Sequence, residues 1–386
     1  MSEFKVEIVR LGTIEKLPNS DTLMITNVLG GYPCIVKVGS FREGDLAAYC
    51  PIDSIVPTTH PAFAFLQDSR GNPTSRLKAK RLRGTFSMGL LVPAPAGAKV
   101  GEDVQALFGI EKWEPDESNR KPGRAGGKIA GGDSEKDPGF LPEYTDLEGL
   151  RRWGKVFQEG DPVQISEKCH GCSSRYVFSQ GRLWCGSRHQ IKRAPREPTR
   201  AEFRSYQVKK TWWRLSERFW DTLHGAAELI GIPVTPKTVR PPEPPRGVRE
   251  SVWWQVARLY DLETRLKSTP DIAIYGEIYG PTQDLKYDSP DAPKLAVYDV
   301  MDLQTRRWYD TDEAITLVRR LGLEMVPEIY RGPWKEELRD LAEGPTTIGS
   351  GAHVREGIVI RSLKEETHPG LSRKILKLVG QGYLLR

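Results

Sequence analysis

The sequence predicts an α+β protein in which an all-β domain precedes a larger domain of antiparallel sheets with flanking helices. Short alternating apolar segments fill roughly the first 110 residues, a stretch almost free of large apolar side chains follows, and the remainder mixes strand-like and helix-like patterns. At 386 residues the chain is long enough for two domains that each bury their own apolar core.

The first domain, assigned to residues 1–113, alternates with period two in three segments. These segments cover residues 6–9, 24–29 and 34–38, and turn signals such as Gly30-Gly31 separate the strand-like runs. Many short strands joined by frequent turns are typical of a small barrel. We therefore expect an OB-like barrel at the N-terminus.

A flexible linker is expected at residues 114–142, because Pro, Gly, Ser and charged residues dominate from Glu114 to Asp137 and cannot form a core. The second domain is assigned to residues 143–386. Two groups of apolar residues recur there at helical spacing, and other segments alternate or run as short apolar strands. The groups are Val252, Val256, Leu259, Leu262 and Leu266, and then Ile315, Val318 and Leu321.

The composition limits the class of protein. The net charge of +6 favours a partner rich in phosphates, although the bias is modest. We expect no membrane association, because no apolar run approaches the roughly 20 residues that span a bilayer. Five cysteines, an odd number in a long chain, favour a reducing compartment over a disulfide framework. We expect a cytoplasmic protein and assign it as a monomer.

The most informative segment is Glu167-Lys168-Cys169-His170-Gly171, in which a lysine ends an alternating strand and a glycine follows it closely. A lysine and glycine at this spacing are common by chance, and alone would indicate an exposed loop lysine. Five later segments, in a fixed order, give the motif its weight. They cover residues 183–188, 275–280, 295–299, 356–360 and 374–377.

Together these segments resemble motifs I, Ia, III, IIIa, IV and V of the superfamily of polynucleotide ligases and capping enzymes. The resemblance implies that Lys168 forms a phosphoramide with AMP, that Glu277 holds a ribose hydroxyl and that Glu356 holds a metal ion through its water shell. It implies ATP and Mg²⁺ or Mn²⁺ as cofactors and the catalytic set Lys168, Glu277, Glu356 and Lys377. The implied ATP-binding residues are Glu167, Lys168, Gly171, Arg175, Arg188, Glu277, Tyr298, Lys374 and Lys377.

The side-chain chemistry agrees with these roles. Tyr298 offers a ring for stacking on adenine, although an aromatic residue on an apolar strand is more often part of a core. Glu167 offers an acceptor for the adenine amino group, and Arg175 and Arg188 offer forked donors for phosphate or ribose.

The two lysines of the last segment are not equivalent. Superfamily members carry two lysines separated by one residue, whereas here two residues separate Lys374 from Lys377. Lys377 stands between two leucines as an inward-pointing charge, and such a charge requires a partner, for which a nucleotide phosphate is suitable. We therefore favour Lys377 over Lys374.

The nucleophile and the metal each require a particular environment. A lysine amine attacks phosphorus only when neutral, so the site should lower the pKa of Lys168 through burial, a metal ion or a nearby lysine. A magnesium ion prefers oxygen ligands and keeps several waters, so carboxylates on separate strands are the expected ligands.

A structural zinc site is a less favoured alternative. Cys169, Cys172, Cys185 and His189 have the spacing of such a site. Zinc at these residues would pull the Lys168 loop into a metal knuckle and compete with its use as a nucleophile.

The likeness is closest in residues 144–150, 159–168 and 181–184, with residues 51–57 and 81–93 in agreement. It resembles the Deinococcus-type ATP-dependent RNA ligase family, in which an OB module precedes the nucleotidyltransferase domain. The resemblance covers nearly the whole chain apart from the linker and an elaborated stretch at residues 193–250. It implies sealing of 3′-hydroxyl/5′-phosphate nicks in duplexes with RNA on the 3′-hydroxyl side, as in RNA repair.

The N-terminal barrel is the candidate nucleic-acid-binding domain. Only nine residues follow Lys377, too few for the C-terminal OB domain that conventional DNA ligases append. Residues 76–83 place five positive charges within eight positions, as a surface that follows a phosphate backbone requires, although a solvated basic strand would look the same. The charges belong to Arg76, Lys78, Lys80, Arg81 and Arg83.

Two kinds of alternative remain open. Within the same chemistry the protein could be a DNA ligase or a GTP-using capping enzyme, and nucleotide choice would separate them. In a different class it could be a nucleic-acid-binding accessory protein with a degenerate catalytic domain. The intact set of Lys168, Glu277, Glu356 and Lys377 argues against degeneration.

Overall fold

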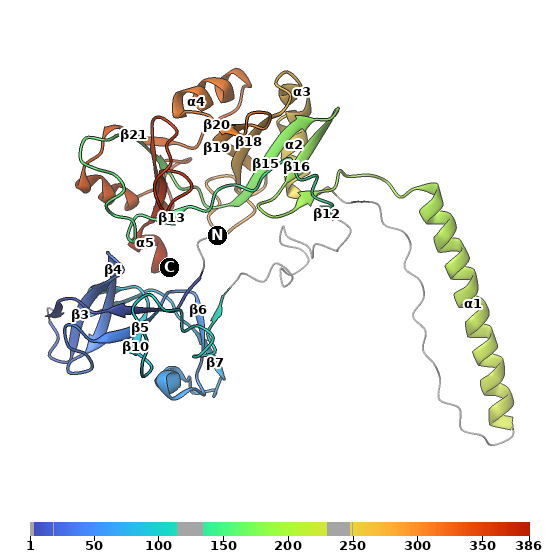
Figure 1. Cartoon of the computed structure of the whole chain (residues 1–386). Helices are drawn as coiled ribbons and strands as arrows, with labels where there is room; N and C mark the ends of the chain where they lie inside the picture. Colours follow the sequence, from blue (N-terminus) through green and yellow to red (C-terminus); the bar gives the residue numbers. More distant parts are fainter. Residues whose placement is uncertain (1–3, 18, 114–133, 230–247, 249) are drawn as a thin grey trace.

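The computed structural model describes the whole chain except residues 1–3, 18, 114–133, 230–247 and 249. Figure 1 shows two bodies and a helix: the first domain lies below, the second lies above it, and helix α1 (Arg200–Leu229) stands to one side.

The first domain consists of short strands, and the predicted strand segments coincide with β1, β3 and β4. Its elements are β1 (Glu7–Arg10), β2 (Ile14–Lys16), β3 (Leu23–Val28), β4 (Tyr32–Lys37), β5 (Leu46–Cys50), β6 (Ser54–Pro57), η1 (Pro61–Leu66), β7 (Thr74–Arg76), β8 (Lys80–Leu82), β9 (Thr85–Ser87), β10 (Leu90–Pro93) and β11 (Glu111–Lys112).

These strands pair as β1-β5-β10, β2-β3-β4, β11-β6-β7 and the hairpin β8-β9, and all of the pairs are antiparallel. Strand β5 contributes to two apolar clusters: Ala48 and Cys50 belong to one, and Ala47 and Tyr49 to the other. Because successive side chains of a strand point to opposite faces, this alternation lets one strand serve both halves of the barrel core.

The second domain contains two larger sheets. Its strands are β12 (Ser134–Glu135), β13 (Glu148–Gly149), β14 (Pro162–Glu167), β15 (Cys172–Ser179), β16 (Arg182–Gly186), β17 (Ile191–Lys192), β18 (Ile272–Tyr279), β19 (Lys294–Asp302), β20 (Arg307–Trp308), β21 (Glu328–Pro333), β22 (Gly357–Ser362) and β23 (Ile375–Val379). Its helices besides α1 are α2 (Val252–Leu259), α3 (Leu262–Lys267), α4 (Thr311–Arg320), η2 (Glu336–Ala342) and α5 (Gln381–Leu384).

One sheet has the order β12-β17-β16-β15-β18-β19-β20 and the other β13-β23-β22-β14-β21. Helices α2, α3 and α4 pack on the first sheet through a cluster that includes Val256, Leu266 and Leu317, whereas η2 packs on the second sheet through Ala342. The pairs are antiparallel except for the short parallel pair of β13 with β23. The predicted α+β class of antiparallel sheets with flanking helices is confirmed.

One of the two predicted helical segments differs from its sequence pattern, and the other agrees with it. The helical spacing from Val252 to Leu266 continues across two short helices, because Asp261 between them adopts a left-handed conformation with φ of 46°. In contrast, α4 matches its predicted spacing and begins with a capping box formed by Asp310 and Glu313.

The predicted linker is too long at its C-terminal end. Strand β12 pairs with β17, and Leu141 is buried against the seven-stranded sheet, so residues 134–142 belong to the second domain. Their Ser, Asp and Pro content hid the short edge strand. The remaining part of the predicted linker, residues 114–133, lies outside the described residues.

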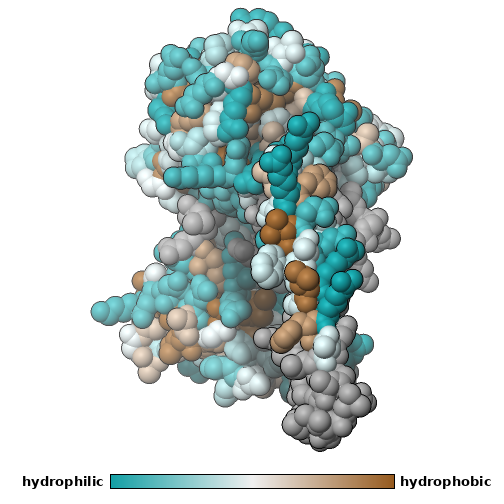
Figure 2. All heavy atoms as spheres, turned by 90° about the vertical axis from the view of Figure 1, so that its right-hand side faces the viewer, coloured by the Kyte–Doolittle hydropathy of each residue, from teal (hydrophilic) through white to brown (hydrophobic). Residues whose placement is uncertain are grey.

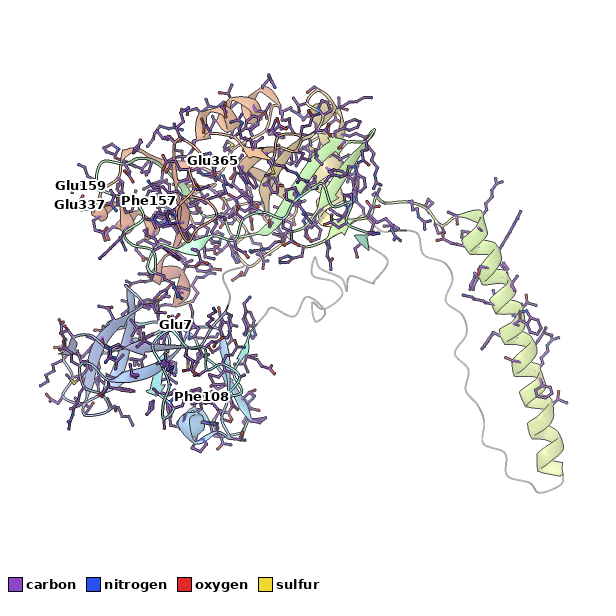
Figure 3. The ribbon with its side chains drawn as sticks, in the orientation of Figure 1. Glu7, Phe108, Phe157, Glu159, Glu337 and Glu365 are labelled. Carbon is purple, nitrogen blue, oxygen red and sulfur yellow. The ribbon has the colours of Figure 1, made fainter. Side chains whose placement is uncertain are left out.

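The two domains meet through defined contacts. Arg152 Nη2 lies 2.9 Å from Glu7 Oε2, and Figure 3 shows Glu7 on the side of the first domain that faces the second. The backbone of Gly31 approaches so closely that a Cβ there would lie 3.1 Å from the Arg151 carbonyl oxygen. The junction encloses the cavity described below.

Among the residues that the structure describes, no helix is both long and apolar enough to cross a membrane.

Candidate active site

A cavity of about 640 Å³ lies between the two domains and the two sheets of the second domain. The first domain contributes Phe4, Lys5 and Lys112 to its wall. The second domain contributes most of the predicted site residues: Glu167, Lys168, Arg188, Glu277, Tyr298 and Lys377.

Lys168 follows β14 directly and reaches a carboxylate on the neighbouring strand. Its backbone N–H donates to Gly357 O at 2.9 Å, and its Nζ donates to Glu356 Oε1 at 2.5 Å. The geometry follows from the antiparallel pairing of β14 with β22, because Lys168 comes just after one strand and Glu356 just before the other. The sheet therefore holds the amine against the carboxylate.

The electrostatics of Lys168 differ from the prediction. Burial lowers the pKa of Lys168, but the carboxylates of Glu356 and Glu277 raise it, and the net pKa is raised rather than lowered. Burial raises the pKa of Glu356, but the positive charge of Lys168 outweighs it, and the net pKa is lowered. The protein groups alone therefore hold Lys168 as an ammonium paired with Glu356.

Glu277 lies on strand β18 of the other, seven-stranded sheet. Burial, opposed by Lys168, raises the pKa of Glu277 to about 7. The loop from Lys168 to Gly171 crosses β18 so closely that a Cβ on Gly171 would collide with the Ile278 carbonyl oxygen. Gly171 is therefore required where the predicted motif has a glycine, although its role here is close packing.

The carboxylates of Glu277 and Glu356 fit a hydrated divalent cation. Glu356 Oε2 has no hydrogen bond of good geometry and lies 3.3 Å from His170 Nδ1. Across the part of the chain that the structure describes, no three His, Cys, Asp or Glu side chains converge as a complete metal site. This donor set suits Mg²⁺ or Mn²⁺, which keeps waters and takes substrate phosphate oxygens, rather than an ion held by protein ligands alone.

The side chains of Lys377 and Lys374 differ in whether they line the cavity. Lys377 lines the cavity, and burial together with the charges of Lys168 and Arg188 lowers its pKa to about 8. Its Nζ has no hydrogen bond or ion pair with any described residue. Lys374 Nζ instead lies 2.8 Å from Asp161 and 3.3 Å from Glu366, outside the cavity lining. The prediction that Lys374 binds ATP is therefore corrected.

Two further predicted contact residues bind the protein itself. The Glu167 carboxylate accepts hydrogen bonds from the Thr346 hydroxyl and, at 2.7 Å, from Thr347 N, and it also lines the cavity, so its contact with an adenine amino group stays a prediction. Arg175 is buried and donates to the carbonyl oxygens of Leu141 and Ser187, away from the cavity lining. Both side chains hold the protein scaffold.

Tyr298 and Arg188 lie at the cavity. The Tyr298 hydroxyl is 3.0 Å from Ser173 Oγ, and its ring centroid is 4.7 Å from that of Tyr144. Arg188 is half exposed and pairs with Asp146.

The sequence interpretation missed a network around His170. Its Nε2 lies 2.8 Å from Asp284 Oδ1, its Nδ1 lies 3.0 Å from the Tyr383 hydroxyl, and its backbone N–H donates to Tyr287. Tyr383 comes from α5 near the C-terminus. The position of His170 between the nucleophile and the glycine was a visible signal, but its partners are distant in the sequence.

The cysteines do not form the alternative zinc site. Cys169 is buried in a cluster with Tyr279 and Leu285, whereas Cys185 lies in the core beneath α2 and α3. His189 Nδ1 is 2.9 Å from Glu143. The cysteines are instead small side chains that fit their separate surroundings.

The predicted basic surface divides into two parts. Arg76 pairs with Asp53 at 2.7 Å and stacks over Trp113, so it stabilises its own domain. Lys78, Lys80, Arg81 and Arg83 lie on and beside the β8-β9 hairpin, where Arg83 and Gly84 form the turn with positive φ.

Comparison with known proteins agrees with this architecture. Residues 238–379 match the RNA ligase family model, and residues 5–94 match an OB-fold domain model. A search of curated proteins finds no match. The first match agrees with the predicted ligase-type domain and the second with the predicted N-terminal OB module; the Deinococcus-type subgroup remains a prediction.

Solved structures of similar fold include Naegleria gruberi RNA ligase with PPi, which is 21% identical with a TM-score of 0.70 over 99% of this chain and 98% of that one. A mutant of that ligase with ATP and Mn is 20% identical with a TM-score of 0.69, over 98% of this chain and 97% of that one. A mutant with AMP and Mn is 20% identical with a TM-score of 0.71, over 99% and 98%. These likenesses confirm the predicted fold class, an OB-like domain followed by an α+β domain of antiparallel sheets.

Proposed function

We propose that the chain is an ATP-dependent RNA ligase that seals 3′-hydroxyl/5′-phosphate nicks, in duplexes with RNA on the 3′-hydroxyl side, through a lysyl-AMP intermediate. The observation that carries the proposal is Lys168 held against Glu356 in a cavity that also contains Glu277 and Lys377. The similar fold of an RNA ligase whose structures are described with ATP and Mn supports the choice of nucleotide and metal.

In the first step the Lys168 amine attacks the α-phosphorus of ATP. An N–P bond forms, the bond from the α-phosphorus to the pyrophosphate oxygen breaks, and the amine gives up its proton. Glu356 accepts the hydrogen bond from Nζ and so aims the amine. A divalent cation held by Glu356 and Glu277 through waters would neutralise phosphate charge and, in place of the present excess of carboxylates, favour the neutral amine.

Lys377 is suited to bind a phosphate oxygen of ATP. Its pKa of about 8 means that the surrounding protein groups disfavour its charge. A phosphate beside it would restore the full positive charge, and the ammonium would stabilise the charge that develops on the leaving pyrophosphate. Glu148 and Glu356 attract this charge, but among the described residues none forms a hydrogen bond or ion pair with the ammonium group.

Tyr298 and Arg188 are suited to the nucleoside end. Tyr298 lies on the cavity wall with its hydroxyl fixed by Ser173, so its ring is available as a rigid surface for adenine. Arg188 lies at the cavity with a guanidinium that offers several donors to ribose or phosphate. These assignments retain two of the predicted ATP contacts.

The later steps require nucleic acid. AMP passes from Lys168 to a 5′-phosphate, and a 3′-hydroxyl then attacks that phosphate and expels AMP. Lys78, Lys80, Arg81 and Arg83 on the first domain would bind the phosphate backbone. We further propose that the protein acts as a monomer in the cytoplasm, in keeping with its five free thiols.

A sealing assay tests this function. Nicked duplexes carrying RNA or DNA on the 3′-hydroxyl side are incubated with ATP, GTP or ATP with EDTA. The proposal predicts sealing with ATP and metal only, and faster sealing with RNA on that side. Equal sealing of the all-DNA nick would assign a DNA ligase, and sealing supported by GTP alone would contradict the ATP assignment.

A further inference from the structure

Helix α1 is the largest feature that the proposed function leaves unused. It spans Arg200–Leu229 and extends away from both domains in Figure 1. Figure 2 shows hydrophilic and hydrophobic side chains following one another along it. A helix that leaves the domain body exposes its sides to whatever the protein binds.

The first part of α1 is strongly basic. Residues 200–219 contain six lysines and arginines and two glutamates. One of these glutamates, Glu202, is already paired with Arg196 at 2.7 Å and accepts hydrogen bonds from Thr199 at the start of the helix. Its charge is therefore not available to offset the cations farther along.

The cations of α1 are not compensated by described side chains. Among the described residues, no ion pair involves Arg204, Lys209, Lys210, Arg214 or Arg218. Two exposed arginines of the domain body differ, since Arg258 pairs with Glu250 and Arg307 with Glu313. The excess of six lysines and arginines over two glutamates in residues 200–219 of a projecting helix creates a local positive potential.

These cations form a line that also carries aromatic rings. Phe203, Tyr206, Lys210, Arg214 and Arg218 follow one another at intervals of three and four residues, which places them on one side of an α-helix. Lys210 Nζ lies 5.7 Å from the Tyr206 ring centroid. Interleaved cations and aromatic rings are the surface that binds a nucleic-acid backbone and its bases.

Helix α1 follows the cavity wall closely in sequence. Arg188 and His189 line the cavity, the short strand β17 (Ile191–Lys192) follows them, and α1 begins at Arg200, from which it extends away from the domain body (Figure 1). A nucleic-acid strand that leaves the cavity in the direction of this segment would meet the basic side of α1.

We propose that α1 is a nucleic-acid-binding arm whose basic side, defined by Lys210, Arg214 and Arg218, contacts the phosphate backbone of the RNA-containing substrate beside the nick. The inference rests on the proposed function, because it takes the cavity as the place of sealing. It adds a contact surface in the second domain to the basic hairpin of the first.

The test compares full-length variants for binding to a fluorescent nicked RNA-containing duplex at several salt concentrations. The arm variant combines Lys210→Gln, Arg214→Gln and Arg218→Gln. The matched control removes three exposed cations elsewhere, through Arg319→Gln, Arg320→Gln and Lys335→Gln. Glutamine keeps helix propensity, and circular dichroism checks that α1 remains helical.

We expect the arm variant to bind at least about tenfold more weakly near 0.1 M salt. The slope of log affinity against log salt should become shallower by about 2 to 3, since fewer phosphate contacts release fewer ions. The control variant should stay within about twofold of the wild type. Equal affinity and slope for arm and control variants would overturn the proposal.

Self-adenylylation distinguishes failure of the arm from failure of the ligase function, because this step needs no nucleic acid. A wild type that fails to adenylylate, while the arm variant still loses RNA affinity, would refute the ligase function and keep the arm. A wild type that adenylylates, while the arm variant keeps its RNA affinity, would refute the arm and keep the ligase function.

Sedimentation of the RNA-free protein tests a different use of α1. The apolar line of Val208, Trp212 and Leu215, each more than half exposed, could pair two copies of the chain. An RNA-independent dimer abolished by Trp212→Ala, with RNA affinity unchanged in the arm variant, would assign α1 to self-association and overturn the proposal.

Discussion

Charged side chains on the two sides of the five-stranded sheet differ in how they are paired. On the outer side, Lys374 is enclosed by the carboxylates of Asp161 and Glu366. On the cavity side, Lys377 has its pKa lowered to about 8, and Lys168 and Glu356 form a close pair beside a second carboxylate. The charges of the outer side are therefore paired within the protein, whereas those of the cavity side would be balanced by a bound anion and cation.

The largest effect should come from Glu356. The Glu356→Gln variant is expected to slow adenylylation by roughly 10² to 10³, because the amine loses its aiming carboxylate and the cation loses a ligand. The Glu366→Gln variant removes the same charge from the outer side and should stay within about threefold of the wild type. Single-turnover transfer of labelled AMP measures both, and equal losses would remove the distinction between the two sides.

Replacing Lys377 should lower the adenylylation activity and raise the free energy of unfolding. The Lys377→Met variant is expected to lose roughly 10² in adenylylation and yet to be more stable near pH 7, by on the order of 1 kcal/mol. Between pH 8 and the ordinary lysine range the unfolded chain binds more protons than the folded protein, so wild-type stability rises with pH there and the difference shrinks.

The Lys374→Met variant is the control for Lys377. It should keep its activity within about threefold and lose about 1 kcal/mol of stability, because two carboxylates are left without their cation. Urea unfolding at pH 7 and pH 10 measures both variants. If Lys377→Met were less stable than the wild type at pH 7, the charge of Lys377 would not be disfavoured by its surroundings, contrary to our expectation.

Glu277 should show the opposite dependence on pH. Its pKa is raised to about 7, so between the ordinary glutamate range and pH 7 the folded protein binds a proton that the unfolded chain does not. Wild-type stability should fall as pH rises through this window, whereas Glu277→Gln should show less of this fall and be more stable at pH 8, by on the order of 1 kcal/mol. Urea unfolding at pH 5 and pH 8 measures the difference, and an equal change in stability for both proteins would refute the assignment.

The smallest effect should come from the domain junction. The pair of Glu7 and Arg152 is partly exposed, and a double-mutant cycle with Glu7→Gln and Arg152→Gln should give a coupling of about 0.2 to 1 kcal/mol in urea unfolding. Adenylylation should remain within about threefold. A tenfold loss of adenylylation activity in either single variant would show that the domain junction takes part in catalysis.

The fold and the principal site residues were readable because they lie on strands in sequence order. Lys168, Glu277, Glu356 and Lys377 each flank or occupy an apolar strand, and the sheets bring Lys168, Glu277 and Lys377 to one cavity with Glu356 against Lys168. The same pattern does not show which backbone groups will need a partner. Arg175 donates hydrogen bonds to two carbonyl oxygens, and Glu167 accepts hydrogen bonds from two threonines. These partners lie in loops that are distant in the sequence.

Other features depend on contacts that no local pattern records. His170 meets Tyr383 across 213 positions. The edge strand β12 has too few residues for alternation to be visible. The direction of Lys374 depends on Asp161, which sequence spacing alone cannot place.

The central claim is that Lys168 becomes covalently linked to AMP. Intact mass measured after incubation with ATP and Mg²⁺, followed by peptide mapping, tests it most directly. We expect a gain of one AMP, located on Lys168, that disappears in Lys168→Ala and persists in Lys374→Met. No gain on protein free of preformed adenylate, or AMP located on another lysine, would contradict it.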